Sequence, residues 1–68
     1  MRKNLLRRKQ VEAITGLSRS SIYAKMEKGT FPKSIKLSTR SVGWLESEVI
    51  EWIDQRINDS RTNNEAQI

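Results

Sequence analysis

Two short amphipathic patterns, separated by a tight break, occupy the first half of the chain. Apolar residues three or four positions apart mark one side of residues 9–15 and one side of residues 19–28, the spacing of amphipathic helices. Most other positions are polar, so each predicted helix has one buried line and one exposed face. The buried lines consist of Val11 and Ile14 in the first helix and of Ile22 and Met26 in the second.

The break between these helices has the chemistry of a helix-turn-helix motif. Gly16 and Leu17 are predicted to form the turn. Ser18 stands where a helix N-cap belongs, because its hydroxyl can accept the free N–H groups of the next first turn. Gly29 is a stop signal after the second helix. Two short helices joined by a glycine-containing turn of about three or four residues are typical of helix-turn-helix units.

Thr30, Phe31 and Pro32 end the second helix, and Phe31 is expected to be a buried apolar anchor. A β-hairpin is predicted to follow Pro32. Two runs with a period of two residues flank a polar tip at residues 38–41. Both strands are too short to be stable alone, so they must pack on the helices. The alternating apolar residues are Ile35 and Leu37 in the first strand and Val42 and Trp44 in the second.

A third helix is predicted to begin at residue 46 or 47. Acidic side chains in its first turns suit the positive N-terminal end of a helix dipole. Apolar residues then recur at i, i+3, i+4 and i+8, which forms one apolar face. This face consists of Val49, Trp52, Ile53 and Ile57. We interpret both Trp44 and Trp52 as core residues.

A chain of 68 residues permits one domain, which we place at residues 1–57. Leu5 and Leu6 are expected to form a short extended segment packed under this domain. Residues 58–68 are polar and without periodicity, and we expect a disordered tail there. Cysteine and histidine are absent, which excludes disulfides and the usual zinc sites, and no apolar run reaches the length of a membrane span.

The charge is distributed unevenly along the chain. Residues 1–45 contain 11 Lys/Arg and 2 Glu, whereas residues 46–68 contain 2 Arg and 6 Asp/Glu, so a net charge of +9 is followed by one of −4. A basic body with an acidic last helix suggests a protein that lays one face on a polyanion. The alternative is an ordinary solvated basic surface. We found no histidine or cysteine nucleophile, no phosphate-binding glycine loop and no base beside the serines, so we do not expect an enzyme.

The second helix has the properties of a recognition helix for the DNA major groove. Small side chains such as Ser20 and Ala24 occupy the middle of its exposed face, which allows its backbone to approach a groove. Arg19 is the candidate for a bidentate guanine contact, and Tyr23 is either a DNA contact or a core residue beside Met26. The other candidates on this helix and its cap are Ser18, Ser20, Ser21, Lys25 and Lys28.

The predicted hairpin would contact the minor groove beside it. Arg40 at the tip is the candidate for insertion, and its alternative is an exposed turn arginine. Lys36 and Thr39 are expected on phosphates. Another phosphate-binding group precedes the first helix, whose N-terminus can itself bind a phosphate, and consists of Arg7, Arg8 and Lys9.

Several segments together resemble the AlpA family of small regulators encoded by phages and genomic islands. These segments are residues 15–23 (TGLSRSSIY), 28–32 (KGTFP) and 42–49 (VGWLESEV), together with Lys36, Leu37, Arg40 and Trp52. The resemblance covers residues 5–57 and implies an α+β, mainly helical fold: a winged helix-turn-helix with three helices and a two-stranded β-hairpin wing. This fold is related to the DNA-binding domains of MerR proteins and excisionases. Ser38 stands where many relatives carry glycine, which leaves the type of turn open.

The resemblance also implies a cytoplasmic, nucleoid-associated regulator of an integrated mobile element. Its partners would be double-stranded DNA, an integrase and further copies of itself on adjacent sites, without a cofactor or a membrane. Some members of the family act as excisionases, or recombination directionality factors, and others switch on an integrase gene. An activator or repressor without a role in recombination is one alternative. An RNA- or protein-interaction module is a more distant one, because RNA readers favour exposed aromatic residues and only Tyr23 qualifies.

Overall fold

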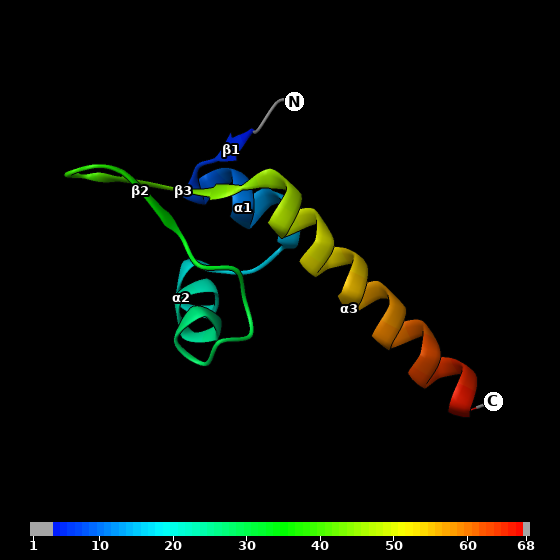
Figure 1. The fold of residues 1–68 in the computed structure, drawn as a ribbon. Helices are drawn as coiled ribbons and strands as arrows, with labels where there is room; N and C mark the ends of the chain where they lie inside the picture. Colours follow the sequence, from blue (N-terminus) through cyan, green and yellow to red (C-terminus); the bar gives the residue numbers. More distant parts are fainter. Residues whose placement is uncertain (1–3, 68) are drawn as a thin grey trace.

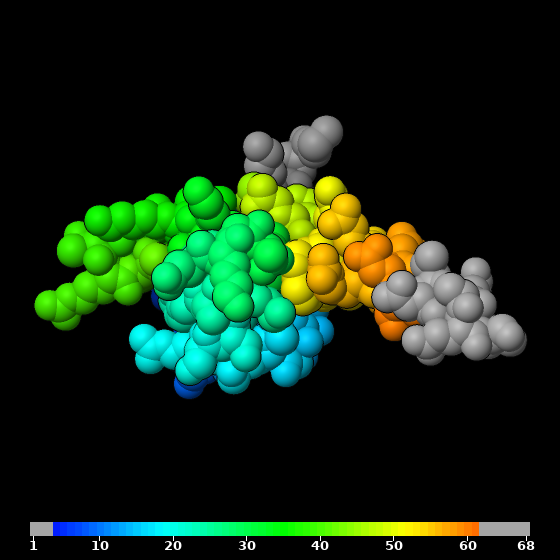
Figure 2. Space-filling view, turned by 90° about the horizontal axis from the view of Figure 1, so that it is seen from below, coloured from blue at the N-terminus to red at the C-terminus, as the bar shows by residue number. Residues whose placement is uncertain are grey.

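The computed structural model describes the backbone of residues 4–67 and the side chains of residues 4–61. Three helices and a small antiparallel sheet form one body, from which a β-hairpin and the last helix project on opposite sides (Figures 1 and 2). The elements in chain order are β1 (Leu5–Leu6), α1 (Arg8–Thr15), α2 (Arg19–Glu27), β2 (Ile35–Ser38), β3 (Ser41–Leu45) and α3 (Glu46–Gln67). The predicted α+β, mainly helical fold is therefore confirmed.

The helix-turn-helix unit is formed by α1 and α2, as predicted. Gly16 ends α1 with a φ of 75°, a left-handed conformation that glycine adopts without a steric penalty, and its N–H donates to the Glu12 carbonyl at 2.8 Å. Ser18 caps α2, since its Oγ accepts from the Ser21 N–H at 3.2 Å. Gly29 has a φ of 78° and follows the end of α2. These local signals place the two helices relative to each other.

The sheet has three strands in the order β1-β3-β2, because β1 pairs with β3 in addition to the predicted two-stranded wing. Leu5 pairs with Leu45 and Leu6 with Trp44, so the extended segment that we expected is an edge strand of the sheet. A run of two residues is too short to show a period of two, and this pairing therefore had no signal in the sequence. Asn4 strengthens the contact, because its carbonyl accepts from the Glu46 N–H at 2.9 Å.

The hairpin of β2 and β3, which we call the wing, turns at Thr39 and Arg40. Non-glycine residues with positive φ do not occur between residues 4 and 67, so the turn is neither of the two primed types that normally close two-residue hairpins. The register instead shifts by one residue between Lys36 and Ser38, which leaves Leu37 in a β-bulge. The bulge explains how the wing closes although Ser38 and its neighbours offer no glycine.

Gly43 is buried where β3 passes beneath Leu37. A Cβ atom at this position would lie 3.0 Å from Leu37 Cδ1 and 3.2 Å from the carbonyl oxygen of Leu6. The first contact is with a movable side chain, whereas the second is with backbone that is held by the pairing of β1 and β3. A side chain at position 43 would therefore need both Leu37 and the Leu6 backbone to shift.

Replacing Gly43 by alanine is expected to lower the free energy of unfolding by about 1–3 kcal/mol, the usual cost of overpacking. Urea denaturation followed by circular dichroism measures this change. In a Leu37→Ala background the same substitution should still be destabilising, because the contact with the Leu6 oxygen remains. An unchanged denaturation midpoint for Gly43→Ala would show that β1 moves aside without cost.

The core is small and lies between the helices and β3. Its buried residues are Leu6, Val11, Ile22, Phe31, Trp44 and Val49. Leu17, Met26, Val42, Trp52 and Ile53 pack around them. Five apolar positions that were expected to pack are instead exposed, namely Leu5, Ile14, Ile35, Leu37 and Ile57. A body of this size can bury only one line of residues on each helix, and the wing projects beyond the body. Periodicity alone therefore predicted more core residues than the fold buries.

The segment after α2 is attached to α3 through Trp52. The Trp52 indole N–H donates to the Thr30 carbonyl at 2.6 Å, and its ring lies edge-on to Phe31 with centroids 4.9 Å apart. The backbone of α3 continues to Gln67, and the expectation of a disordered tail at residues 58–68 stays a prediction. Residue 68 lies outside the described residues. The placement of the domain boundary at residue 57 stays a prediction.

Candidate nucleic-acid interface

An open hollow of about 540 Å³ lies between the two helices of the helix-turn-helix and the wing. Five cationic side chains from three separate segments line it, together with one aromatic ring and two residues of β3. We call it the basic hollow. Its lining residues are Arg7, Arg8, Lys9, Arg19, Tyr23, Arg40, Ser41 and Val42. Six of these were predicted as DNA contacts from the sequence, and the structure brings them together on one surface.

Arg7 connects the start of α1 to the wing. It occupies the N-cap position of α1, where its backbone N–H donates to Gln10 Oε1 at 2.8 Å. Its guanidinium Nη2 donates to Ser41 Oγ at 3.3 Å, across 34 positions of the sequence. Ser41 follows directly on Arg40, so Arg7 helps to hold the turn of the wing beside the helices. Ser41 could not be selected from the sequence, because only the fold brings it to Arg7.

Arg8 is oriented by Glu12, one turn further along α1. Its Nε lies 3.1 Å from Glu12 Oε2, and both side chains are 31% exposed. Arg8 Nε is buried and lacks good hydrogen-bond geometry, so this contact is an ion pair rather than a well-formed hydrogen bond. The terminal nitrogens of the guanidinium remain for an anion. The i,i+4 spacing of Arg8 and Glu12 would have predicted this ion pair if the first helix had been predicted to begin at residue 8 and not at residue 9.

Tyr23 lies between Arg19 and the core. The Arg19 guanidinium carbon is 5.9 Å from the Tyr23 ring centroid, within the range of a cation–π contact. On its other side the ring meets Trp44 edge-on, with centroids 6.4 Å apart. Tyr23 is 37% exposed, so it belongs to the surface and also rests on the core. The interpretation of Tyr23 as a buried core residue is therefore wrong, and its contact with DNA stays a prediction.

The three predicted serines of α2 and its cap differ in whether their hydroxyls already form hydrogen bonds within the protein. Ser18 Oγ accepts from the Ser21 N–H and donates to Ser21 Oγ at 3.1 Å, so both hydroxyls take part in capping α2. Ser20 is exposed on the outer face of α2. Of the three, Ser20 is therefore the one whose hydroxyl has no part in the cap.

The remaining predicted residues do not line the basic hollow. Lys28, at the C-cap of α2, and Lys36 and Thr39, on the wing, are exposed. Lys25 is half-buried, and its carbonyl accepts from both the N–H and the hydroxyl of Thr30. Their roles on phosphates stay predictions.

The fold is that of a winged helix-turn-helix protein. Two of its three helices form the helix-turn-helix, and the β-hairpin shares a basic surface with them. A family model described as "Prophage CP4-57 regulatory protein (AlpA)" matches residues 4–57. The chain therefore belongs to the AlpA family of prophage regulatory proteins, and the resemblance seen in the sequence is confirmed.

Two curated proteins are similar over most of the chain. One, from Enterobacteria phage P4, is named "Uncharacterized protein ORF88" and is 41% identical over 61 residues, which cover 90% of this chain and 69% of the phage protein. The other, from Escherichia coli (strain K12), is named "DNA-binding transcriptional activator AlpA" and is 40% identical over 58 residues, covering 76% of this chain and 83% of that protein. Within the described residues, none of the helices has the length and apolarity needed to cross a membrane.

Proposed function

We propose that this protein is a sequence-specific DNA-binding regulator of an integrated mobile element. The observation that carries the proposal is the basic hollow, where cations from α1, α2 and the wing converge on one surface. The N-terminal part of α2 enters the major groove, where Arg19 reads a guanine edge. Arg40 enters the adjacent minor groove, and Arg7, Arg8 and Lys9 neutralise phosphates between the two elements.

Electrostatics dominates the affinity of such a surface. If about six phosphates are neutralised, the logarithm of the affinity should fall with the logarithm of the salt concentration with a slope of about −5. A single module of this kind buries only about 600–1,000 Å², which is little for useful specificity. Several copies on adjacent sites, with bending of the DNA between them, would supply the rest.

Two regulatory roles are consistent with this mode of binding. In the first, the protein is an excisionase that bends attachment-site DNA so that an integrase works in the direction of excision, and it can also regulate the integrase gene. In the second, it is an activator or repressor without a role in recombination. The name of the Escherichia coli relative, a transcriptional activator, supports regulation of transcription. Bending of the DNA at adjacent sites would serve both roles. In either role the protein would act in the cytoplasm, bound to the nucleoid.

Binding to a DNA fragment with adjacent sites is expected to be cooperative and to bend the fragment. Electrophoretic mobility-shift titrations and circular permutation of the site measure the two effects. A single, unbent and non-cooperative complex would contradict assembly on DNA. An excision assay with integrase, with and without this protein, then separates the roles: excision that depends on the protein identifies an excisionase, and unchanged excision leaves the transcriptional role.

A further inference from the structure

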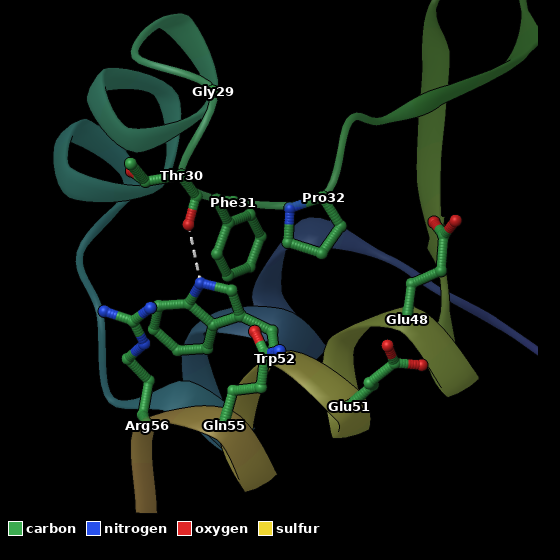
Figure 3. Close-up of a pocket in the computed structure, with 9 residues that line it drawn as sticks. All are labelled: Gly29, Thr30, Phe31, Pro32, Glu48, Glu51, Trp52, Gln55 and Arg56. Carbon is green, nitrogen blue, oxygen red and sulfur yellow. Dashed lines mark hydrogen bonds between the residues drawn. The ribbon is translucent and has the colours of Figure 1, made fainter. Parts of the chain in front are cut away.

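A second hollow, of about 580 Å³, lies away from the wing, between residues 29–32 and the first half of α3 (Figure 3). We call it the α3 hollow. Trp52 stands in its middle, with Phe31 and Pro32 above, and the carboxylates of Glu48 and Glu51 lie at one end. At the other end the Arg56 guanidinium lies 5.3 Å from the Trp52 ring centroid. The hollow thus offers an aromatic floor next to two exposed negative charges.

The outer edge of the wing has the complementary chemistry. β2 is an edge strand, because β3 lies between it and β1. Ile35 and Leu37 are 37% and 38% exposed on it, and Lys33 is exposed just before its start. An exposed edge strand with aliphatic side chains presents unpaired backbone groups to another chain. The basic hollow does not include Ile35, Leu37 or Lys33, so DNA binding as proposed does not account for the exposure of these side chains.

We propose that the β2 edge of one copy docks into the α3 hollow of a second copy bound at an adjacent DNA site, with Lys33 facing Glu48 and Glu51. The aliphatic side chains of β2 would pack on Trp52 and Pro32, and the lysine would meet the acidic end of the hollow. This inference rests on the proposed function, because DNA is what aligns the two copies.

The shape of the molecule makes this contact head-to-tail. The wing and α3 leave the body on opposite sides, so a copy that gives its wing to one neighbour keeps its α3 hollow for another (Figures 1 and 2). Heterologous contacts of this kind propagate into open arrays instead of closing into a symmetric pair. A symmetric contact between two α3 helices would oppose like charges, because residues 46–61 carry 5 acidic residues and 2 arginines.

The contact is expected to form on DNA and not in free solution. Exposed ion pairs contribute little by themselves and are screened by salt. Two copies held at neighbouring sites have a high effective concentration for each other, so a weak contact becomes a measurable cooperativity. The protein should therefore be monomeric without DNA.

A charge swap tests the pairing of Lys33 with the α3 hollow. Binding is measured with two probes, a duplex carrying one site obtained by selection from random DNA and a duplex carrying two such sites in tandem. Lys33→Glu and Glu51→Lys should each abolish cooperativity on the two-site duplex and retain binding to the one-site duplex. The double variant K33E/E51K should recover cooperativity, because the charges are exchanged and the pair is restored.

Matched variants control for net charge. Asp54→Lys makes the same change on α3 outside the hollow, and Arg61→Glu makes the same change as Lys33→Glu far from the wing. Both should keep cooperativity. Cooperativity that survives in K33E and E51K, or that is lost equally in the controls, overturns the inference, as does failure of the double variant to recover. A wild-type protein that does not bind the one-site duplex overturns the proposed function itself; one that binds two sites independently overturns only the assembly.

Discussion

Replacing Arg19 by alanine is expected to remove most of the preference of the protein for its own DNA site. A bidentate contact between arginine and a guanine edge contributes about 1–3 kcal/mol of discrimination, so affinity for the preferred site should fall by about 5- to 150-fold. Arg19 begins α2 and lines the basic hollow, where it rests on the Tyr23 ring. Affinity for unrelated DNA should fall much less, because four other cations of the hollow remain.

The matched control is Lys28→Ala at the other end of α2. Lys28 is exposed and lies outside the basic hollow, so its substitution should weaken binding to all sequences by a similar factor. Mobility-shift titrations with the selected site and with scrambled DNA, at one salt concentration, measure both ratios. If the two variants lose specific and non-specific affinity in the same proportion, the division of roles along α2 is wrong.

Replacing Trp44 by alanine is expected to leave the protein largely unfolded at room temperature. Trp44 is fully buried, and truncation of a buried tryptophan costs about 3–5 kcal/mol. A domain of this size rarely has more than about 3–5 kcal/mol of stability from its single core. Trp44 also contacts Tyr23, and its indole N–H donates to the Pro32 carbonyl at 3.1 Å. The substitution therefore disturbs β3, α2 and the segment before β2 together.

Trp44→Phe separates volume from hydrogen bonding. Phenylalanine retains most of the apolar contact but leaves the Pro32 carbonyl without its donor, which should cost about 1–3 kcal/mol. Circular dichroism during urea denaturation should then rank the wild type above Trp44→Phe and both above Trp44→Ala. A Trp44→Ala variant with the wild-type midpoint would show that the core does not depend on this ring.

The helix-turn-helix was predictable because its determinants are local. Gly16 and Gly29 take the left-handed conformations that their positions require, and Ser18 caps the helix that follows it. Each of these effects operates within a few residues, so a single sequence contains the necessary information. The alternation in the wing was also predictable, since β2 and β3 are consecutive and joined by a short turn.

The features that could not be predicted depend on contacts between distant parts of the chain. The pairing of Leu6 with Trp44 joins residues that are far apart in sequence, and the bulge at Leu37 depends on how the turn closes. Ile14 is exposed because no other part of the described fold packs over it, and the periodicity of α1 cannot show this. Tertiary packing therefore decided which apolar residues form the core.

The candidate site was predictable as a set of residues but not as an arrangement. Arginine and lysine at the start of α1, in α2 and in the wing were selected for their charge and position. Their convergence depends on Arg7 reaching Ser41 and on Glu12 orienting Arg8, which are properties of the folded chain. Lys25 and Lys28 do not line the basic hollow, although they were predicted with the same group. A helical projection shows in which direction each side chain of α2 points, but it does not show on which side of α2 the wing lies.

The bond between Trp52 and Thr30 has a mechanical consequence. Thr30 follows the end of α2, and Trp52 belongs to α3, so rotation of α3 about its own axis must either break this bond or turn α2 with it. The edge-on contact of Phe31 with the same indole adds to the coupling. A torque applied to the projecting helix is thus transmitted through the Trp52 indole to α2, the helix that we propose reads the bases.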